Sequence, residues 1–449
     1  MRCAPLAKGL WVDPAVGGSA ADLAKAEPWA SACSPRSMSR PLTLVSEAAR
    51  VPAPRRVMSG RERFPGVSEA EWRDWRWQHR NALRTEEEFS RLIELTPAER
   101  QGLLDAAGRF RFGVTPYYAS LIDPRHPFCP VRMQAVPSSA EAVASPGDLR
   151  DPLSEDRHRP VRAIVHRYRD RVLFLSTDTC SVYCRHCTRR RVTGGDEGAF
   201  DRAAAEEGIA YVRAHGEVRD VIVSGGDPLV LGDERLAWLL RSLRAVPHVE
   251  ILRLATRAPV TCPMRVSDEL ARLLRTMKPL FVVTHFNHPK ECTGEAREAC
   301  ERLVDHGVPV ENQTVLLRRV NSSARIIADL NRRLLTFRVR PYYLHQGDVA
   351  EGTAHLRTPL ACGIGIVEAL RGSVSGLAVP HLALDLPAGG GKVTLQPEYR
   401  LGPVPGGTAF RNPSNGRYVY PDPPESDCSC PYDEVFYEGA PDGLERVER

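Results

Sequence analysis

The sequence predicts an α/β protein built on a partial (β/α)6 barrel, with an N-terminal helical layer before it and a loop-rich C-terminal extension after it. From about residue 162, short apolar runs alternate with amphipathic segments at intervals of roughly 30 residues. Continuous apolar strands between helices are typical of a parallel sheet covered by helices. Three cysteines directly follow the first of these strands, and the carboxyl ends of barrel strands are where such folds place their chemistry.

Composition limits the class of protein. The chain has 449 residues and a 42% apolar content, enough for one large catalytic domain with extensions. No apolar run approaches the ~20 residues of a membrane span, and no apolar block follows Arg2 as in a secretory signal. Twelve scattered cysteines favour a reducing cytoplasm, and a net charge of +5 gives little reason to expect a nucleic-acid partner.

The chain divides by composition into four parts. The first is rich in Ala, Pro, Ser and Arg and is expected to be disordered. The second carries helix starts at the capping box Ser68–Glu71 and at Thr96. The parts are 1–60 (N-terminal extension), 61–160 (helical region), 161–378 (partial barrel) and 379–449 (strand, glycine run and tail).

The barrel elements follow from apolar periodicity. In 233–246, for example, leucines recur at helical spacing. The predicted strands are 171–177, 219–224, 249–255, 280–286, 311–317 and 337–344, with one more at 380–385. The predicted helices are 233–246, 267–277, 294–306, 323–336 and 358–370.

Cys180, Cys184 and Cys187 follow the first strand at Cx3CxxC spacing. Three thiolates can each bind one iron of a 4Fe–4S cluster, which leaves the fourth iron open to bind a small molecule. This spacing is typical of enzymes that cleave S-adenosylmethionine reductively to a carbon radical. A zinc knuckle needs a fourth ligand, for which His186 is the local candidate in an awkward position, and three unrelated core cysteines are the other alternative.

The turn Ser224, Gly225, Gly226 and Asp227 follows the second strand. Glycines let the backbone approach a ligand, and Asp227 could accept a hydrogen bond from the amino group of S-adenosylmethionine. The alternative is a tight turn with Asp227 at a helix start.

A second glycine run, Gly389–Gly391, precedes Lys392 and follows Asp385. A lysine that forms a Schiff base needs a partly desolvated site. Of the five lysines, Lys392 is by elimination the best candidate to hold pyridoxal phosphate, although a phosphate-binding or solvent-exposed lysine fits the local sequence equally well. The other lysines are Lys8, Lys25, Lys278 and Lys290.

Two more groups of polar residues fit this site. Arg167, Tyr168 and Arg171 precede or begin the first strand, where arginines could bind a phosphate; a surface salt-bridge cluster is the alternative. Asp348 and Asp385 follow the last two strands and could together hold a cationic side chain. General acid–base chemistry and simple surface solvation are the competing interpretations.

These motifs together identify a family. From about Arg63 to Cys430 the chain resembles lysine 2,3-aminomutase, a radical SAM enzyme with a partial barrel. The longest matching motifs are Trp72–Gln78 (WRDWRWQ), Cys184–Arg191 (CRHCTRRR), Thr284–Pro289 (THFNHP) and Arg338–Tyr343 (RVRPYY).

The resemblance implies a role for each candidate residue. A radical formed from S-adenosylmethionine would remove a hydrogen atom from C3, the amino group would move from C2 to C3, and the hydrogen would return at C2. The implied residues are Cys180, Cys184 and Cys187 for the cluster; Ser224, Gly225, Gly226, Asp227, His285 and Gln313 for S-adenosylmethionine; Lys392, Arg167, Tyr168 and Arg171 for pyridoxal phosphate; and Arg189, Asp348 and Asp385 for the substrate carboxylate and distal ammonium.

The expected reaction is L-lysine to β-lysine. One alternative is an L-arginine 2,3-aminomutase that makes β-arginine for antibiotic biosynthesis. It is suggested by Gly347 and His345, which stand at positions where the family has larger or different residues. The other alternative is a non-enzymatic iron–sulfur sensor. An external electron donor such as flavodoxin or ferredoxin and a homo-oligomer are also expected.

The sequence departs from the family at its structural zinc site, which uses one cysteine after Val320-Asn321 and three in the tail. Ser323 stands at the first position, and the tail keeps only Cys428 and Cys430. This departure puts zinc, and the assembly that it supports, in doubt.

Overall fold

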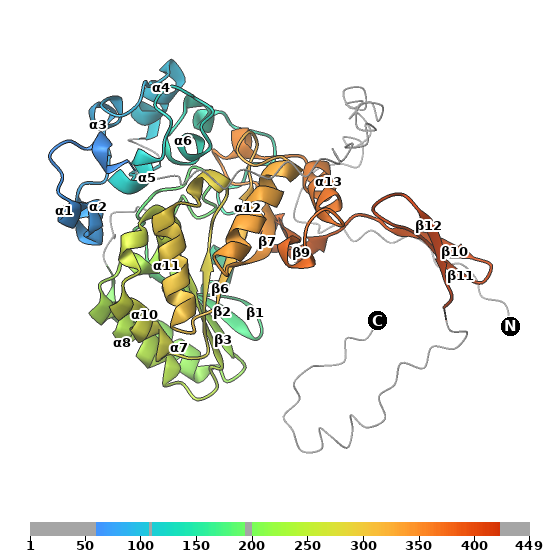
Figure 1. Cartoon of the computed structure of the whole chain (residues 1–449). Coiled ribbons are helices and arrows are strands. Elements are labelled where there is room, and N and C mark those ends of the chain that lie inside the picture. Colours follow the sequence, from blue (N-terminus) through green and yellow to red (C-terminus); the bar gives the residue numbers. More distant parts are fainter. Residues whose placement is uncertain (1–59, 107–109, 194–199, 423–449) are drawn as a thin grey trace, which may run out of the picture. The chain divides into compact units, whose positions relative to one another are not determined.

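A nine-stranded sheet in the order β1 to β9 forms the centre of the computed structural model (Figure 1). Its strands β2 to β8 run parallel, and β1 and β9 pair antiparallel at the two ends. The structure describes residues 60–106, 110–193 and 200–422, so the predictions for the N-terminal extension and for Cys428 and Cys430 fall outside it. The strands are β1 (Ile164–Tyr168), β2 (Arg171–Thr177), β3 (Asp220–Gly225), β4 (Ile251–Ala255), β5 (Leu280–Thr284), β6 (Val310–Leu316), β7 (Arg340–Gln346), β8 (His381–Leu386) and β9 (Gly391–Leu395).

Side chains along these strands alternate between two environments. Burial alternates along both β2 and β6, because successive side chains of a strand point to opposite faces. In β6 the buried Val310 and Leu316 belong to apolar clusters, whereas the half-buried Glu311 and Gln313 line an interior cavity. The sheet therefore curves around a polar space, with its apolar face packed against helices.

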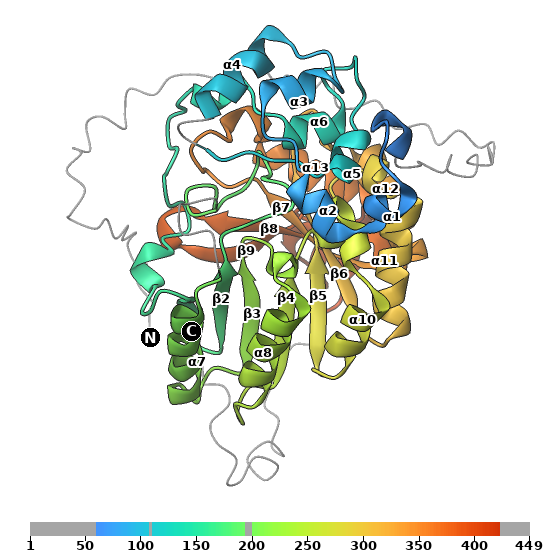
Figure 2. The ribbon, with the colours of Figure 1, turned by 90° about the vertical axis from the view of Figure 1, so that its left-hand side faces the viewer.

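The helices predicted between the strands are all present, and Figure 2 shows α7, α8 and α10 in front of the strands. Asp201, Ser267 and Thr293 cap α7, α10 and α11 by accepting a hydrogen bond from a first-turn backbone N–H. The helix α7 is an additional element. The barrel helices are α7 (Arg202–Ala214), α8 (Asp233–Arg244), α9 (Ala258–Thr261), α10 (Asp268–Arg275), α11 (Gly294–Asp305), α12 (Ala324–Thr336) and α13 (Leu360–Leu370).

Six short helices form a layer at one end of the strands (Figure 2). The capping box at Ser68 and Glu71 is confirmed. Trp72 and Tyr117 of this layer belong to the same buried cluster as barrel residues such as Phe174, so the layer and the barrel share one core. The helices are α1 (Glu69–Arg73), α2 (Trp75–Arg80), α3 (Glu86–Ser90), α4 (Pro97–Ala106), α5 (Pro116–Ser120) and α6 (Pro130–Ala135).

The two edge strands of the sheet meet through side chains rather than through a backbone ladder. Arg167 in β1 donates a hydrogen bond to the carbonyl of Gly389, and the Tyr168 hydroxyl accepts one from the backbone N–H of Lys392 in β9 at 3.1 Å. These contacts bring residues more than 220 positions apart to one side of the cavity. The result is the expected partial barrel, joined at its open seam by two side chains.

The C-terminal extension contains more strand than the sequence suggested. A three-stranded antiparallel sheet consists of β10 (Arg400–Val404), β11 (Gly407–Arg411) and β12 (Arg417–Tyr420). Pro405 and Gly406 lie between the paired residues Val404 and Gly407. The Pro- and Gly-rich sequence that was expected to form a loop therefore forms a hairpin turn, which the φ preferences of proline and glycine permit. Within the described residues, no helix has the combined length and apolarity that a membrane crossing requires.

Candidate active site

The interior of the barrel holds a cavity of about 670 Å³. It is large enough for a drug-sized molecule, since such sites run from roughly 300 to 1,000 Å³. Most of the residues singled out in the sequence line this one cavity. They are Arg167, Tyr168, Arg171, Arg189, Ser224, His285, Gln313, Asp385 and Lys392.

Lys392 lies on β9 opposite Asp385 on β8. Its Nζ is 2.5 Å from Asp385 Oδ2, 3.4 Å from His345 Nδ1 and 5.5 Å from the centre of the Tyr343 ring. The side chain is 30% exposed. Lys392 therefore points into the cavity with an aromatic ring, an imidazole and one carboxylate around its amine.

Asp348 is not among the residues that line the cavity. The Thr188 hydroxyl donates a hydrogen bond to Asp348 Oδ2. Burial, helped by the charge of Asp385, raises the pKa of Asp348 to about 6, while the Thr188 bond and the cations of Lys392 and Arg189 act the other way. Asp348 and Asp385 thus lie within electrostatic reach of each other, and a nearby cation favours the ionised form of Asp348.

Arg189 lines the cavity and forms an ion pair with Glu155. Its Nε donates to Glu155 Oε1 at 2.8 Å and its Nη2 lies 2.6 Å from the same oxygen. Glu155 is only 8% exposed. Sequence patterns did not indicate Glu155, because it lies 34 positions before Arg189 in a segment without a recognisable motif.

The two cavity histidines are neutral. Burial, with the cations of Arg257 and Arg189, lowers the pKa of His285 to about 4. Burial, with the ammonium of Lys392, lowers the pKa of His345 well below its ordinary value. At neutral pH both imidazoles are therefore hydrogen-bonding groups without charge.

The cysteine loop follows β2 directly. All three of its thiols are free. Burial, the Asp227 carboxylate and the neighbouring thiols raise the pKa of Cys180, and burial with the Cys184 thiol raises that of Cys187. A metal must therefore displace protons on binding.

The donor set of this loop fits an iron–sulfur cluster better than a single ion. Among the described residues, no three Cys, His, Asp or Glu side chains are grouped as ligands of one metal ion. A cluster places each thiolate on a different iron, so its sulfurs need not converge on one point. Three free cysteines in one loop, without a fourth grouped ligand in the described part of the chain, suit a cluster that keeps one iron open.

The glycine turn after β3 holds the start of the cysteine loop. A Cβ on Gly225 would lie 2.4 Å from the carbonyl oxygen of Thr177, and one on Gly226 would lie 2.3 Å from that of Thr179. The backbone N–H of Gly226 donates to Thr177 at 2.5 Å. Only glycine fits so close an approach.

Asp227 does not line the cavity. Its Oδ1 accepts hydrogen bonds from the Leu229 backbone and from Thr256 Oγ1 at 3.0 and 2.6 Å, and its Oδ2 accepts one from the Arg257 backbone at 2.8 Å. It caps the 3₁₀ turn Pro228–Val230. This is the helix-start role that the sequence left open, and Ser224 is the residue of this turn that faces the cavity.

The wall formed by β1, β2 and β9 is rich in cations. The guanidinium of Arg171 stacks on the Tyr168 ring at 4.0 Å and that of Arg167 lies 5.4 Å from it. Gly389 and Gly391 have φ values of +82° and +99°, which lets the backbone turn close to Arg167. Two arginines, a phenol and an amine form a donor set that fits a phosphorylated aldehyde such as pyridoxal phosphate.

Comparisons with known proteins point to the same family as the sequence motifs. Two family descriptions match the chain, "Radical SAM superfamily" over residues 174–329 and "Lysine-2,3-aminomutase" over residues 367–448. An L-lysine 2,3-aminomutase of Fusobacterium nucleatum is 44% identical over 375 residues, which cover 84% of this chain and 88% of that protein. An L-lysine 2,3-aminomutase of Clostridium subterminale is 47% identical over 75% of this chain and 81% of that protein. A glutamate 2,3-aminomutase of Clostridioides difficile is 41% identical over 74% of this chain and 78% of that protein.

Proposed function

The chain belongs to the lysine 2,3-aminomutase family of radical SAM enzymes, and from that premise we propose that it converts L-lysine to β-lysine. One observation carries the choice of substrate. Asp385 binds an ammonium group, that of Lys392, at 2.5 Å, and Asp348 lies within electrostatic reach of the same place. Two carboxylates favour a cationic side chain and would repel the second carboxylate of glutamate.

We assign Cys180, Cys184 and Cys187 to the 4Fe–4S cluster. When bound, the cluster and S-adenosylmethionine supply the carbon radical that abstracts hydrogen. We keep the whole turn from Ser224 to Asp227 as the proposed site for the amino group of S-adenosylmethionine. Gly225 and Gly226 also lie against the start of the cysteine loop, and Asp227 also caps the turn that follows. The residues assigned to S-adenosylmethionine from the cavity side are Ser224, His285 and Gln313.

We further propose that Lys392 carries pyridoxal phosphate. When bound, this cofactor supplies a conjugated system to which the substrate amine is attached. Arg167 and Arg171 would bind its phosphate and Tyr168 would contact it. Lys392 lines the cavity with its amine 3.4 Å from His345 Nδ1, where it would hold the cofactor.

The remaining residues fix the substrate at both ends. Arg189 binds the α-carboxylate through the edge of its guanidinium that Glu155 leaves free. Asp348 and Asp385 bind the distal ammonium. With both ends held, C2 and C3 have one orientation toward the radical, and such positioning removes much of the entropic barrier.

We prefer lysine over arginine because two relatives that match most of this chain are L-lysine 2,3-aminomutases. Gly347, whose small size suggested a longer pocket, does not line the cavity. A Cβ on it would lie 3.4 Å from Arg357 Cγ. His345 lines the cavity, with its Nδ1 3.4 Å from Lys392 Nζ.

The reaction also needs partners. We propose an external one-electron donor such as flavodoxin or ferredoxin, and a homo-oligomer whose assembly does not depend on zinc. In support, Ser323 occupies the expected zinc-cysteine position as the N-cap residue of α12, and a hydroxyl is not a usual ligand of structural zinc.

The test is turnover by the full-length, anaerobically reduced protein. It is incubated with S-adenosylmethionine, pyridoxal phosphate and, in parallel, lysine, arginine or glutamate, and the β-isomers are measured by mass spectrometry. We expect β-lysine from wild type and none from the double variant Asp348→Asn, Asp385→Asn. Turnover of arginine alone would overturn the substrate assignment. A loaded cluster without turnover of any of the three would favour a sensor.

A further inference from the structure

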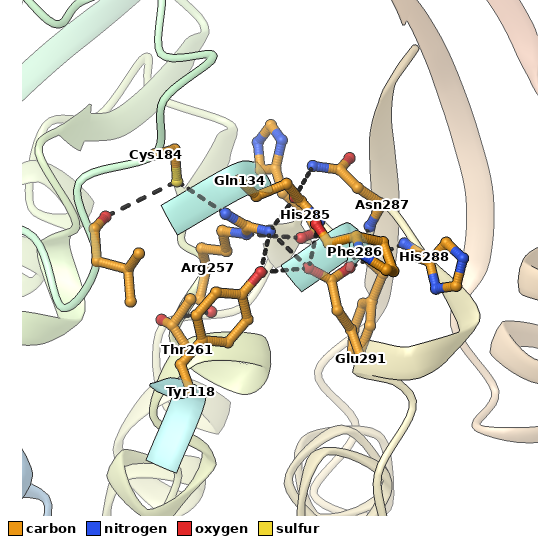
Figure 3. A network of polar contacts seen from close by, with 12 residues as sticks. Tyr118, Gln134, Cys184, Arg257, Thr261, His285, Phe286, Asn287, His288 and Glu291 are labelled. Carbon is orange, nitrogen blue, oxygen red and sulfur yellow. Dashed lines mark hydrogen bonds and ion pairs between the residues drawn. The ribbon is translucent and has the colours of Figure 1, made fainter. Parts of the chain in front are cut away.

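Arg257 is a buried arginine that the sequence did not single out. It follows β4, is 9% exposed, and lies at the centre of a polar network that joins the helical layer to the barrel (Figure 3). Its guanidinium donates to acceptors from five segments of the chain. These acceptors are Cys184 Sγ at 2.8 Å, Glu291 Oε1 at 2.7 Å, Gln134 Oε1 at 2.6 Å, Tyr118 OH at 3.0 Å and His285 O at 3.1 Å.

The network holds the guanidinium in one orientation. Glu291, whose side chain is fully buried, is itself bound by the backbone N–H groups of Asn287 and His288 at 2.6 and 2.9 Å and by the Tyr118 hydroxyl at 2.6 Å. Neither member of the Arg257–Glu291 pair can rotate without breaking several bonds. A buried pair of this kind is costly unless its remaining donors are used.

The three nitrogens of the Arg257 guanidinium have different acceptors. Nη2 and Nε serve the pair and its neighbours, whereas Nη1 is directed to Cys184. A simple structural ion pair would not need a sulfur acceptor, because Nη2 alone already binds Glu291. The thiol in question lies in the loop assigned above to the iron–sulfur cluster.

We propose that Arg257 is a positioning residue for that cluster, fixing Cys184 and raising the reduction potential. The inference rests on the proposed assignment of Cys184 as a ligand. A reduced cluster carries one more negative charge than an oxidised one, so an N–H donor on a cationic group stabilises the reduced form more. Hydrogen bonds to the cluster sulfurs, and donors that contact the ligands from outside, set the potentials of such clusters.

The test is an anaerobic redox titration of full-length protein reconstituted with iron and sulfide, followed by electron paramagnetic resonance. In Arg257→Gln we expect the equilibrium constant for cluster reduction to fall tenfold or more, which for one electron is about 59 mV. Arg265→Gln is the matched control, because Arg265 is also a buried arginine but binds Leu229 and Leu231 carbonyls instead of a thiol. Tyr118→Phe removes another contact of the network and leaves Nη1 on Cys184. Both controls should stay within twofold of wild type.

An unchanged potential in Arg257→Gln with four irons per chain would overturn the proposal, as would an equal fall in Tyr118→Phe. If Arg257→Gln does not fold or load, Arg257→Lys is titrated instead. Its single ammonium cannot reach the sulfur and the opposite acceptors together, so a potential equal to wild type would overturn the proposal there too. The redox titration does not depend on turnover. If the potential changes with Arg257 but the protein has no aminomutase activity, the role of Arg257 stands and the proposed function is overturned.

Discussion

Asp385 and Lys392 are register partners across β8 and β9, and the Lys392 ammonium lies 2.5 Å from the Asp385 carboxylate. The antiparallel return of β9 therefore gives the cavity an amine and an ammonium-binding carboxylate at the same point. The two residues are seven positions apart, joined by the glycine run.

Lys392→Ala should abolish covalent attachment of pyridoxal phosphate. Among the three lysines that the structure describes, Lys278, Lys290 and Lys392, only Lys392 lines the cavity. Wild type reduced with borohydride should yield one modified peptide, containing residue 392, by mass spectrometry. Lys290→Ala is the control and should keep the modification, because Lys290 contacts Cys129 outside the cavity. A modified peptide from Lys392→Ala would contradict the assignment.

Asp348 should make lysine binding depend on pH. Burial and Asp385 raise the pKa of Asp348 to about 6, so the carboxylate is protonated below that pH and charged above it. The charged form attracts the substrate ammonium, and KM for lysine should fall as pH rises from 5 to 7. Asp348→Asn should raise KM roughly thirtyfold at pH 7.5, since a bond to a charged group contributes about 2 kcal/mol. It should also remove this part of the pH profile; a profile identical to wild type would contradict the role.

Glu155→Gln should weaken lysine binding through Arg189. The amide keeps one hydrogen bond but loses the charge that orients the guanidinium. We expect KM to rise about tenfold, in the range of a lost charge-assisted bond, with kcat changed much less. Asp156→Asn, which alters an exposed partner of Arg191, is the matched control. A fall in kcat at constant KM would instead place Glu155 in the chemical step.

Gly226→Ala should disturb the cysteine loop. The added Cβ would lie 2.3 Å from the carbonyl of Thr179, directly before Cys180. Overpacking of this kind costs on the order of 2 kcal/mol, so we expect a lower melting temperature and fewer irons per chain. Gly232→Ala is the control, because nothing lies within 4 Å of a Cβ there. Equal iron content in the two variants would show that the turn does not support the loop.

Tyr168→Phe should loosen the seam between β1 and β9. It removes the hydroxyl that accepts the Lys392 backbone N–H at 3.1 Å. Because one hydrogen bond contributes about 1 kcal/mol, the apparent affinity for pyridoxal phosphate, measured by absorbance titration, should fall about fivefold. Tyr211→Phe, whose hydroxyl contacts His166 away from the cavity, should bind as wild type does. An unchanged affinity in Tyr168→Phe would mean that the seam does not shape the cofactor site.

Apolar periodicity along the sequence was enough to predict most strands and helices of the barrel. The strand 171–177 and the helices from Asp233 and Gly294 were predicted from apolar periodicity, and the structure confirms them. Periodicity failed in the C-terminal extension, where exposed strands carry no apolar face to produce an alternation. The element α7 was missed although its alanine-rich sequence favours a helix.

The sequence by itself determined the alternation of strands and helices, the three-cysteine spacing and the family, because each of these is written in residues close together in the chain. Only the tertiary structure decided which distant groups meet: Glu155 with Arg189, Arg257 with Cys184, and Tyr168 with Lys392. The physical reason is that these bonds join residues 34 to 224 positions apart. Such contacts depend on the curvature and register of the whole sheet, which short-range propensities do not specify.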